Sequence, residues 1–185
     1  LIRKDLPIYL VMAGLYEDIE DIENTDGLTF LLRAEKYEMK PLNTDVIRES
    51  YKETLKLSKD AANELAILTK GYAFAYQVIG YYMWESGKKE INDLILSKVD
   101  AALREKVYEK IWSELRPMDK WFLSFIIKKD NMPVSELLEL TKKNHNEWSS
   151  PRKRLIEKGV IDDTRGMAII KLPRFKEYVE SEQRS

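Results

Sequence analysis

A cluster of cations near the C-terminal end of the sequence is best suited to chemistry with an anion. Its first members lie on one short predicted helix and in the turn after it: Arg152, Lys153, Arg154, Lys158 and Arg165. Guanidinium and ammonium groups bind phosphates, and from a helix they can also reach base edges in a DNA groove. Residues 117–178 carry 13 basic and nine acidic side chains, although the whole chain has a net charge of −1. This local excess predicts a polyanionic partner.

The helix that carries these cations has recognisable ends. Ser149 or Ser150 can cap its N-terminus, and Pro151 fits its first turn, where a missing N–H costs nothing. Gly159 can adopt the left-handed conformation that ends a helix. The sequence therefore predicts a short basic helix over residues 151–158.

Two β-prone runs follow this helix, at 160–161 and 167–170, and the Asp- and Gly-containing segment 162–166 between them favours a tight reversal. Residues 118–129 and 133–142 read as two amphipathic helices upstream. The order helix, helix, basic helix, hairpin resembles a winged helix-turn-helix domain, and residues 175–179 are expected to pack as a final helix.

We expect Leu155 and Ile156 to face the core, which leaves Arg152 and Lys153 on the side that would enter a major groove. The predicted DNA-binding residues are Ser149, Arg152, Lys153, Arg154, Lys158, Arg165, Lys171 and Arg174. Two alternatives stay open. The basic helix can be a solvated surface, or the winged helix can be a protein-interaction or autoregulatory module that does not bind DNA.

The amino-acid composition limits the class of protein to which the chain can belong. The 185 residues are 44% apolar and 34% charged, with seven Gly and six Pro, which is typical of a helix-rich globular protein. The chain has no cysteine, which excludes disulfides and thiolate chemistry, and a single histidine, His145, makes no convincing metal site. No apolar run approaches the length of a membrane span, so we expect a soluble, cytoplasmic protein without a membrane partner. The chain begins with Leu1, and we expect a fragment or a processed product.

The N-terminal residues 1–42 read as part of an α/β unit. The apolar run 6–13 predicts a buried strand, and an acidic turn follows at 17–23. Thr25 or Asp26 can cap a helix over 27–34, and a strand is predicted at 36–40. We expect the partner strands to come from a core that this chain lacks.

Residues 43–116 predict a helical bundle with linker helices. Thr44 or Asp45 can cap the first helix, Ser58 starts the second, and Gly87 ends the third. The predicted helices cover 46–57, 59–70 and 72–85, and one or two more helices cover 91–115. The third is aromatic, with Tyr72, Phe74, Tyr76, Tyr81, Tyr82 and Trp84. Such a cluster is most often core, but it can also stack on a base or form a partner interface.

Taken in order, these pieces resemble the C-terminal half of prokaryotic P-loop ATPases of the AAA+/STAND type, related to the archaeal origin-recognition ATPases. LPIYLVMAG at 6–14 resembles the strand that carries the first sensor, and LTFLLRAEKYEMKPL at 28–42 resembles the helix and last strand of the core. LAILTKGYAFAYQVIGYYMWE at 65–85 resembles the lid helices with their Thr-x-Gly-Tyr turn. The segment from 117 to 180 resembles the winged helix appended to the lid.

The resemblance implies a mainly α fold: an α/β remnant, a helical lid and a winged helix. It implies ATP and Mg²⁺ as cofactors of the intact protein, and as partners double-stranded DNA, the missing ATPase core and a homo-oligomer. The chain has no phosphate-binding loop, so we expect no enzymatic activity and no tight nucleotide binding by this fragment. Ala13 and Gly14 stand where relatives place a polar sensor, and 71–80 lacks the second-sensor arginine. Arg33 is the candidate arginine finger; the alternative is a surface ion pair.

Overall fold

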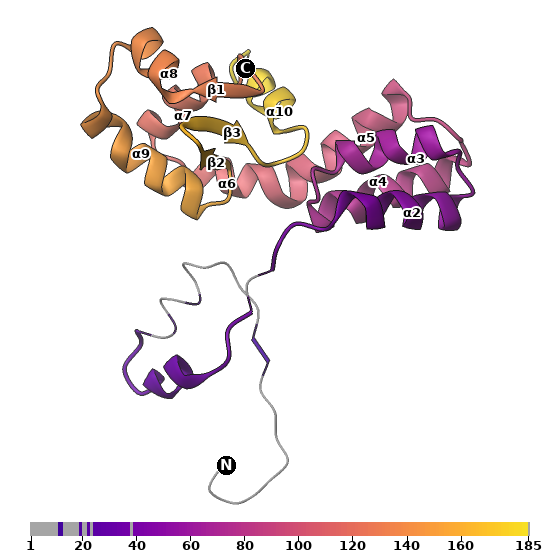
Figure 1. Cartoon of the computed structure of the whole chain (residues 1–185), viewed down its shortest axis with the longest axis horizontal. Helices are drawn as coiled ribbons and strands as arrows, with labels where there is room; N and C mark the ends of the chain where they lie inside the picture. Colours follow the sequence, from indigo (N-terminus) through magenta and orange to yellow (C-terminus); the bar gives the residue numbers. More distant parts are fainter. Residues whose placement is uncertain (1–10, 13–18, 20–21, 23, 38, 185) are drawn as a thin grey trace, which may run out of the picture. The chain divides into compact units, whose positions relative to one another are not determined.

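The computed structural model describes residues 11–12, 19, 22, 24–37 and 39–184. The chain divides into two compact units, residues 1–38 and residues 39–185. The described residues are mainly helical, and three short strands form one antiparallel sheet (Figure 1). The predicted fold class is therefore confirmed in its general form, a mainly α protein with a small β-sheet.

The described residues of the first unit contain little regular structure. The helix predicted at 27–34 is a short 3-10 helix, η2 (Thr29–Arg33), whose N-cap Leu28 makes no side-chain hydrogen bond. Residues 36, 37, 39 and 40 belong to no strand, which corrects the strand predicted at 36–40. A strand needs a hydrogen-bonded neighbour, and the described residues offer none here. The strand predicted at 6–13 and the acidic turn at 17–23 lie almost wholly outside the described residues.

The helical bundle is present as predicted. Its helices are α2 (Thr44–Leu55), α3 (Lys59–Leu68), α4 (Ala73–Ser86) and α5 (Asp93–Leu103). The side chain of Asn43 accepts hydrogen bonds from the backbone N–H groups of Asp45 at 2.8 Å and Val46 at 3.3 Å. The cap of α2 is therefore Asn43, which precedes the predicted caps Thr44 and Asp45 by one and two residues. Ser58 caps α3 as predicted.

The turn after α3 is held by a buried threonine. Thr69 Oγ1 donates to the carbonyl of Ala66 at 2.7 Å and accepts from the N–H of Gly71 at 3.0 Å. Lys70 and Gly71 have φ values of +48° and +74°. A Cβ on Gly71 would lie 2.7 Å from the carbonyl oxygen of Leu42, so this position requires glycine. The turn ends α3 close to where the sequence predicts.

One helical stretch leads from the bundle to the C-terminal elements. Helix α5 continues into a π-helical turn, η3 (Arg104–Tyr108), and then into α6 (Glu109–Glu114). The N–H of Glu109 donates to the carbonyl of Arg104, five residues back, which is the wide bond of a π-turn. The helical region predicted at 91–115 is thus a helix with an internal π-turn.

The C-terminal elements are helices packed around the sheet. They are α7 (Pro117–Ile126), β1 (Asn131–Pro133), α8 (Val134–Thr141), α9 (His145–Glu157), β2 (Ile161–Thr164), β3 (Met167–Ile170) and α10 (Phe175–Glu182). The strand order is β1-β3-β2, and Ala168 in the middle strand pairs with Met132 and with Asp163. Strand β1 was not predicted, because three residues that include Asn and Pro carry no strand signal.

The basic helix is longer than predicted. Helix α9 begins at His145, and Asn144 caps it by accepting two backbone N–H groups of its first turn. The carboxylate of Glu147 accepts the N–H of Asn144 in return at 3.0 Å, which completes a capping box. The predicted caps at 149–150 therefore lie in the middle of the helix, and Pro151 lies inside it rather than in its first turn.

Residues with positive φ end α9 and form the turn of the hairpin. Gly159 has a φ of +65°, which confirms it as the left-handed residue that ends the helix. The reversal is narrower than predicted, because residues 162–164 belong to β2. Arg165 and Gly166, with φ values of +57° and +74°, form the two-residue turn.

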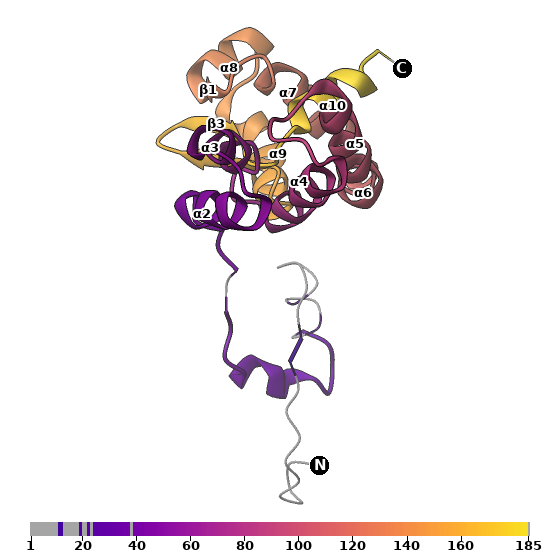
Figure 2. The ribbon, with the colours of Figure 1, turned by 90° about the vertical axis from the view of Figure 1, so that its right-hand side faces the viewer.

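The hydrophobic core runs without a break from the bundle into the C-terminal elements. Buried Tyr108 of η3 packs edge-on against Phe175 of α10, with 5.0 Å between ring centroids, and its hydroxyl donates to the carbonyl of Pro173. Arg174 binds Asp100 of α5 through two hydrogen bonds of 2.7 and 2.8 Å. Figure 2 shows the same elements turned by 90°, with α2 and α4 side by side.

Candidate nucleic-acid interface

Five of the predicted DNA-binding residues are exposed on α9 and around the hairpin, and the fifth, Arg152, is described separately below. Lys153 exposes 77% of its side chain, and its Nζ lies 3.4 Å from Glu157 one turn later. Ser149 precedes Lys153 by one turn and is also exposed. Within the described part of the chain, Arg165 at the hairpin turn and Lys171 after β3 form no ion pair. Ser149, Arg165 and Lys171 can reach an anion without breaking an ion pair, whereas Lys153 would have to leave its exposed pair with Glu157.

Arg152 is held by the hairpin. Its Nε donates to Oδ2 of Asp163 on β2, so the guanidinium bridges α9 and the sheet. The side chain of Asp163 is only 9% exposed, whereas that of Arg152 is 45% exposed. Arg152 is thus accessible to a ligand but fixed in direction.

Arg154 points into the protein rather than toward a partner. Its Nε donates to Oδ2 of Asp119 at 2.9 Å, and a second nitrogen binds Oδ1 of the same carboxylate. Asp119 is fully buried in α7 and also accepts the N–H of Arg116 at 3.1 Å. The hydrogen bond to Asp119 raises the pKa of Arg154. Arg154 therefore joins α9 to α7.

Two further predicted DNA-binding residues serve as internal ties. Lys158 donates to Glu114 of α6 at 2.9 Å and is only 17% exposed, and this bond lowers the pKa of Glu114. Arg174 binds Asp100 and, at 2.7 Å, Glu177. Its pKa is raised, chiefly by the hydrogen bond to Asp100. Both side chains face neighbouring helices, so they could reach a ligand only by breaking these ion pairs.

The structure also places residues that the sequence analysis missed beside this face. Asn146 is exposed in the first turn of α9, and Lys142 is exposed in the turn before it. Both were overlooked because the predicted helix began too late. The capping-box spacing of Asn144 and Glu147 was the signal that would have found them. Ile156, which was expected to face the core, is 37% exposed.

A shallow hollow of about 420 Å³ lies between the N-terminal end of α8, helix α9 and the hairpin. It is lined by Val134, Ser135, His145, Trp148, Arg152, Asp163 and Gly166. Trp148 packs on Phe122 at 4.8 Å between ring centroids, and its buried Nε1 has no hydrogen-bond partner in the described structure. The polar groups that a ligand could meet in this hollow are mainly those of His145, Ser135 and Arg152.

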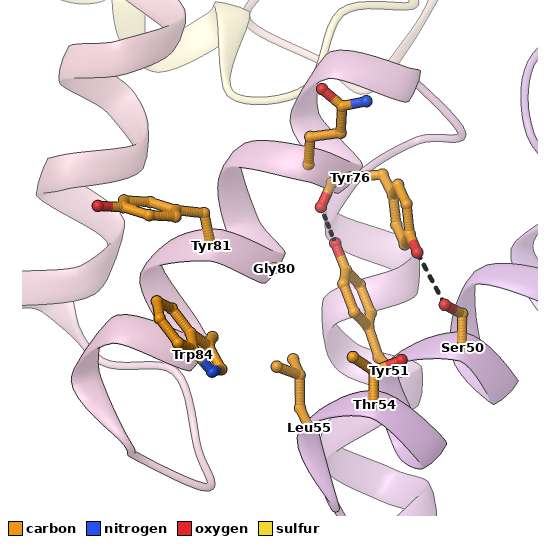
Figure 3. A pocket seen from close by; sticks show the side chains of 9 residues that line it. Ser50, Tyr51, Thr54, Leu55, Tyr76, Gly80, Tyr81 and Trp84 are labelled. Carbon is orange, nitrogen blue, oxygen red and sulfur yellow. Dashed lines mark hydrogen bonds between the residues drawn. The ribbon is translucent and has the colours of Figure 1, made fainter.

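The aromatic cluster of α4 is divided between core and surface. Tyr72, Phe74, Tyr76 and Tyr82 pack against the core, which agrees with the core interpretation for these four. Tyr81 and Trp84 are 53% and 69% exposed. Together with residues of α2 and with Gly80, they line an apolar groove of about 300 Å³ (Figure 3).

Hydrogen bonds fix the other wall of this groove. The hydroxyl of Tyr51 donates to the carbonyl of Tyr76 at 2.6 Å, and the hydroxyls of Ser50 and Tyr76 lie 2.7 Å apart (Figure 3). Burial raises the pKa of Tyr51. The groove is therefore rigid on the α2 side and lined by exposed rings on the other.

The remaining predicted site residues belong to the first unit. Arg33 is exposed at the end of η2, and its role as an arginine finger stays a prediction. Ala13 and Gly14 lie outside the described residues. Among the residues that the structure describes, no three His, Cys, Asp or Glu side chains are grouped to hold a metal ion. None of the described helices combines the length and apolar character needed to cross a bilayer.

Comparison with known proteins gives one family match. Residues 105–179 match the model of a family described as a domain of unknown function, DUF8462. The match begins within η3 and ends within α10, so it includes α6 as well as the sheet and the helices around it. No curated protein and no solved structure matches the chain.

Proposed function

We propose that this chain binds double-stranded DNA through α9 and the β2–β3 hairpin, as the lid and winged-helix region of an AAA+/STAND-type ATPase. The observation that carries the proposal is the order of elements from α7 to β3 together with the strand order β1-β3-β2. A winged helix has this arrangement: a helix, a short strand, two helices, and a hairpin that pairs with the short strand. In this arrangement α9 takes the position of the helix that enters the major groove.

The exposed side chains support this orientation. Asn146, Ser149 and Lys153 follow one another at helical spacing along the outer side of α9 and offer donors for base edges and phosphates. Arg165 at the hairpin tip and Lys171 beyond β3 would contact the backbone on either side. Arg154, Lys158 and Arg174 are left out of this interface, because their charges are used within the protein.

The same proposal assigns the bundle the role of a lid. The proposal assigns ATP and Mg²⁺ to the intact protein, because the sequence of this chain has no phosphate-binding loop. The mechanism proposed for this chain is limited to its own contacts with DNA. Two contacts connect the bundle to the proposed winged helix. Arg174 binds Asp100, and Lys70 Nζ donates to the carbonyl of Ile170 at 2.9 Å. Through these contacts the winged helix would follow any movement of the bundle.

The test is binding of the full chain to a fluorescent mixed-sequence duplex, followed by anisotropy at about 50 mM and about 200 mM salt. The informative variant is Lys153→Gln with Arg165→Asn, because asparagine tolerates the positive φ of the turn. We expect weaker binding to all sequences and a salt slope that falls by about 0.9 for each phosphate that the variant no longer neutralises.

A matched control changes the same number of charges on the bundle. Lys59→Gln with Lys88→Gln removes two exposed lysines that form no ion pair in the described structure, and it should leave affinity unchanged. Absence of wild-type binding at low salt, or an equal effect of the two double variants, would contradict the proposal.

The groove between α2 and α4 favours a second candidate, a protein-interaction module. Trp84 and Tyr81 expose large aromatic surfaces, and such surfaces are enriched in protein interfaces. If the chain does not bind DNA, this candidate predicts that a partner protein protects Trp84 from quenching by iodide. Trp84→Ser should abolish that partner's binding without reducing the helical content.

A further inference from the structure

Asp163 fixes the direction of Arg152. The carboxylate lies on β2, is almost fully covered, and accepts the Nε–H of the guanidinium. A guanidinium carries five N–H donors in a planar fork. Within the described structure, the two terminal nitrogens of Arg152 have no hydrogen-bond partner, and 45% of the side chain remains exposed. The two terminal nitrogens are therefore the groups of Arg152 that a ligand can bind while the Nε–H stays on Asp163.

Such a fork suits two ligands, a phosphate and the edge of a guanine. A phosphate carries a negative charge, and Asp163 beside it would oppose its binding. The O6 and N7 atoms of guanine accept two parallel hydrogen bonds from an arginine and carry no net charge. An arginine that is already paired with a carboxylate is thus better suited to guanine than to the DNA backbone.

The pairing also lowers the entropy cost of recognition. A free arginine side chain loses rotamer freedom when a ligand immobilises it. Arg152 has lost part of that freedom before any ligand arrives, because Asp163 ties its Nε to the hairpin. Preorganisation of this kind favours a geometry-dependent interaction over a diffuse charge interaction.

We propose that Asp163 is a positioning residue that presents the terminal nitrogens of Arg152 to a guanine in the major groove, and that this pair determines the sequence preference of the chain. The proposal rests on the proposed function, since it assumes that α9 lies in the groove. It goes beyond that function by naming the base that is read and the residue that makes the reading selective.

The experiment has two stages with the full chain. Selection from a randomised duplex pool first identifies the preferred sequence, and anisotropy then measures the affinity for this duplex and for duplexes with each G·C pair changed to A·T. For the wild type, we expect one G·C pair whose replacement weakens binding roughly tenfold or more. Arg152→Lys keeps the charge but lacks the fork, so it should lose this discrimination.

Asp163→Ala is the decisive variant, and Asp162→Ala is its matched control. Alanine removes the acceptor of the Arg152 Nε–H, whereas asparagine would keep an oxygen there. Asp162 is the exposed neighbour on the same strand, and its replacement removes the same charge without touching Arg152. We expect Asp163→Ala to reduce discrimination at that one G·C pair by about threefold or more, while the salt slope stays that of the wild type. Asp162→Ala should leave discrimination unchanged. The Arg152 Nε–H resonance in NMR spectra should lose its protection from exchange only in Asp163→Ala.

The outcomes separate the two proposals. Equal behaviour of the two aspartate variants, with both binding all duplexes more tightly, would mean that Asp163 acts only through its charge and would overturn the positioning role. Unchanged discrimination in Arg152→Lys would overturn the assignment of guanine to Arg152. Failure of the wild type to bind any duplex at low salt would overturn the proposed function, and this inference with it.

Discussion

The ion pair of Asp119 and Arg154 should be essential for stability and irrelevant to DNA binding. Asp119 is completely buried in the first turn of α7, and it binds two nitrogens of Arg154 and the backbone N–H of Arg116. Asp119→Ala removes all of these hydrogen bonds and leaves the guanidinium without its counter-charge. Because Arg154 is 23% exposed, water can compensate part of this loss.

The expected cost follows from these bonds. Removal of one partner of a buried ion pair costs about 3–5 kcal/mol, and partial water access to Arg154 places Asp119→Ala at about 3 kcal/mol in the free energy of unfolding. Asp119→Asn should cost less, about 2 kcal/mol, because the amide oxygen can still accept the N–H of Arg116. Arg154→Met should cost about 3 kcal/mol, since it leaves a buried carboxylate unpaired.

The double variant Asp119→Leu with Arg154→Met tests whether the charges or the packing matter. A buried ion pair replaced by apolar side chains of similar size is often close to neutral, so this variant should lie within about 1 kcal/mol of the wild type. The assay is urea unfolding followed by tryptophan fluorescence, and the double-mutant cycle combines the wild type, Asp119→Leu, Arg154→Met and the double variant. The folded double variant should bind a DNA duplex with the wild-type affinity and salt slope.

Two results would refute this account. A cost below about 1 kcal/mol for Asp119→Ala would mean that the ion pair contributes no more than an exposed pair. A stable double variant that binds DNA roughly tenfold more weakly than the wild type would make Arg154 a DNA-binding residue, as its place in the basic helix first suggested.

Two further predictions concern pH and backbone conformation. Burial raises the pKa of Tyr178 to about 12, so the folded state holds the phenol proton more tightly than the unfolded state does. The contribution of this group to the free energy of unfolding should be complete below about pH 10 and should fall as the pH rises toward 12. Tyr178→Phe should reduce that fall in denaturant titrations from about pH 8 upward, and an unchanged fall would show that other groups cause it. Gly71→Ala should cost at least about 2 kcal/mol, because it combines a φ of +74° with a Cβ at 2.7 Å from the Leu42 oxygen. Gly87→Ala, whose Cβ meets nothing within 4 Å at a φ of +64°, should cost only about 1 kcal/mol by thermal unfolding, and equal costs would contradict the steric argument.

Helix boundaries were predictable where the chemistry that sets them is local. Ser58, Gly87 and Gly159 mark helix ends as predicted, because a cap needs only the backbone of the adjacent turn. The start of α9 was misplaced because two sets of capping residues lie close together. The reciprocal bonds of Asn144 and Glu147 satisfy the first turn better than an isolated serine at 149 or 150.

Strand β1 was not predictable from its own residues. Asn131 and Pro133 have low strand propensity, and the segment is extended because it pairs with β3, whose Ile169 and Met167 lie far along the chain. Pro133 is tolerated because β1 is an edge strand. The order of helices and the hairpin could be inferred without β1, but the three-stranded sheet could not.

The sequence by itself determined the mainly helical class, most helix ends, the hairpin and the concentration of cations near α9, because each depends on residue type and local spacing. Only the tertiary structure decided what those cations do. Arg154, Lys158 and Arg174 look like Lys153 in the sequence, but each meets a carboxylate that lies 35, 44 or 74 residues away in the chain, on α7, α6 or α5. Charge is a property of a residue, whereas its availability to a partner depends on what the fold places beside it.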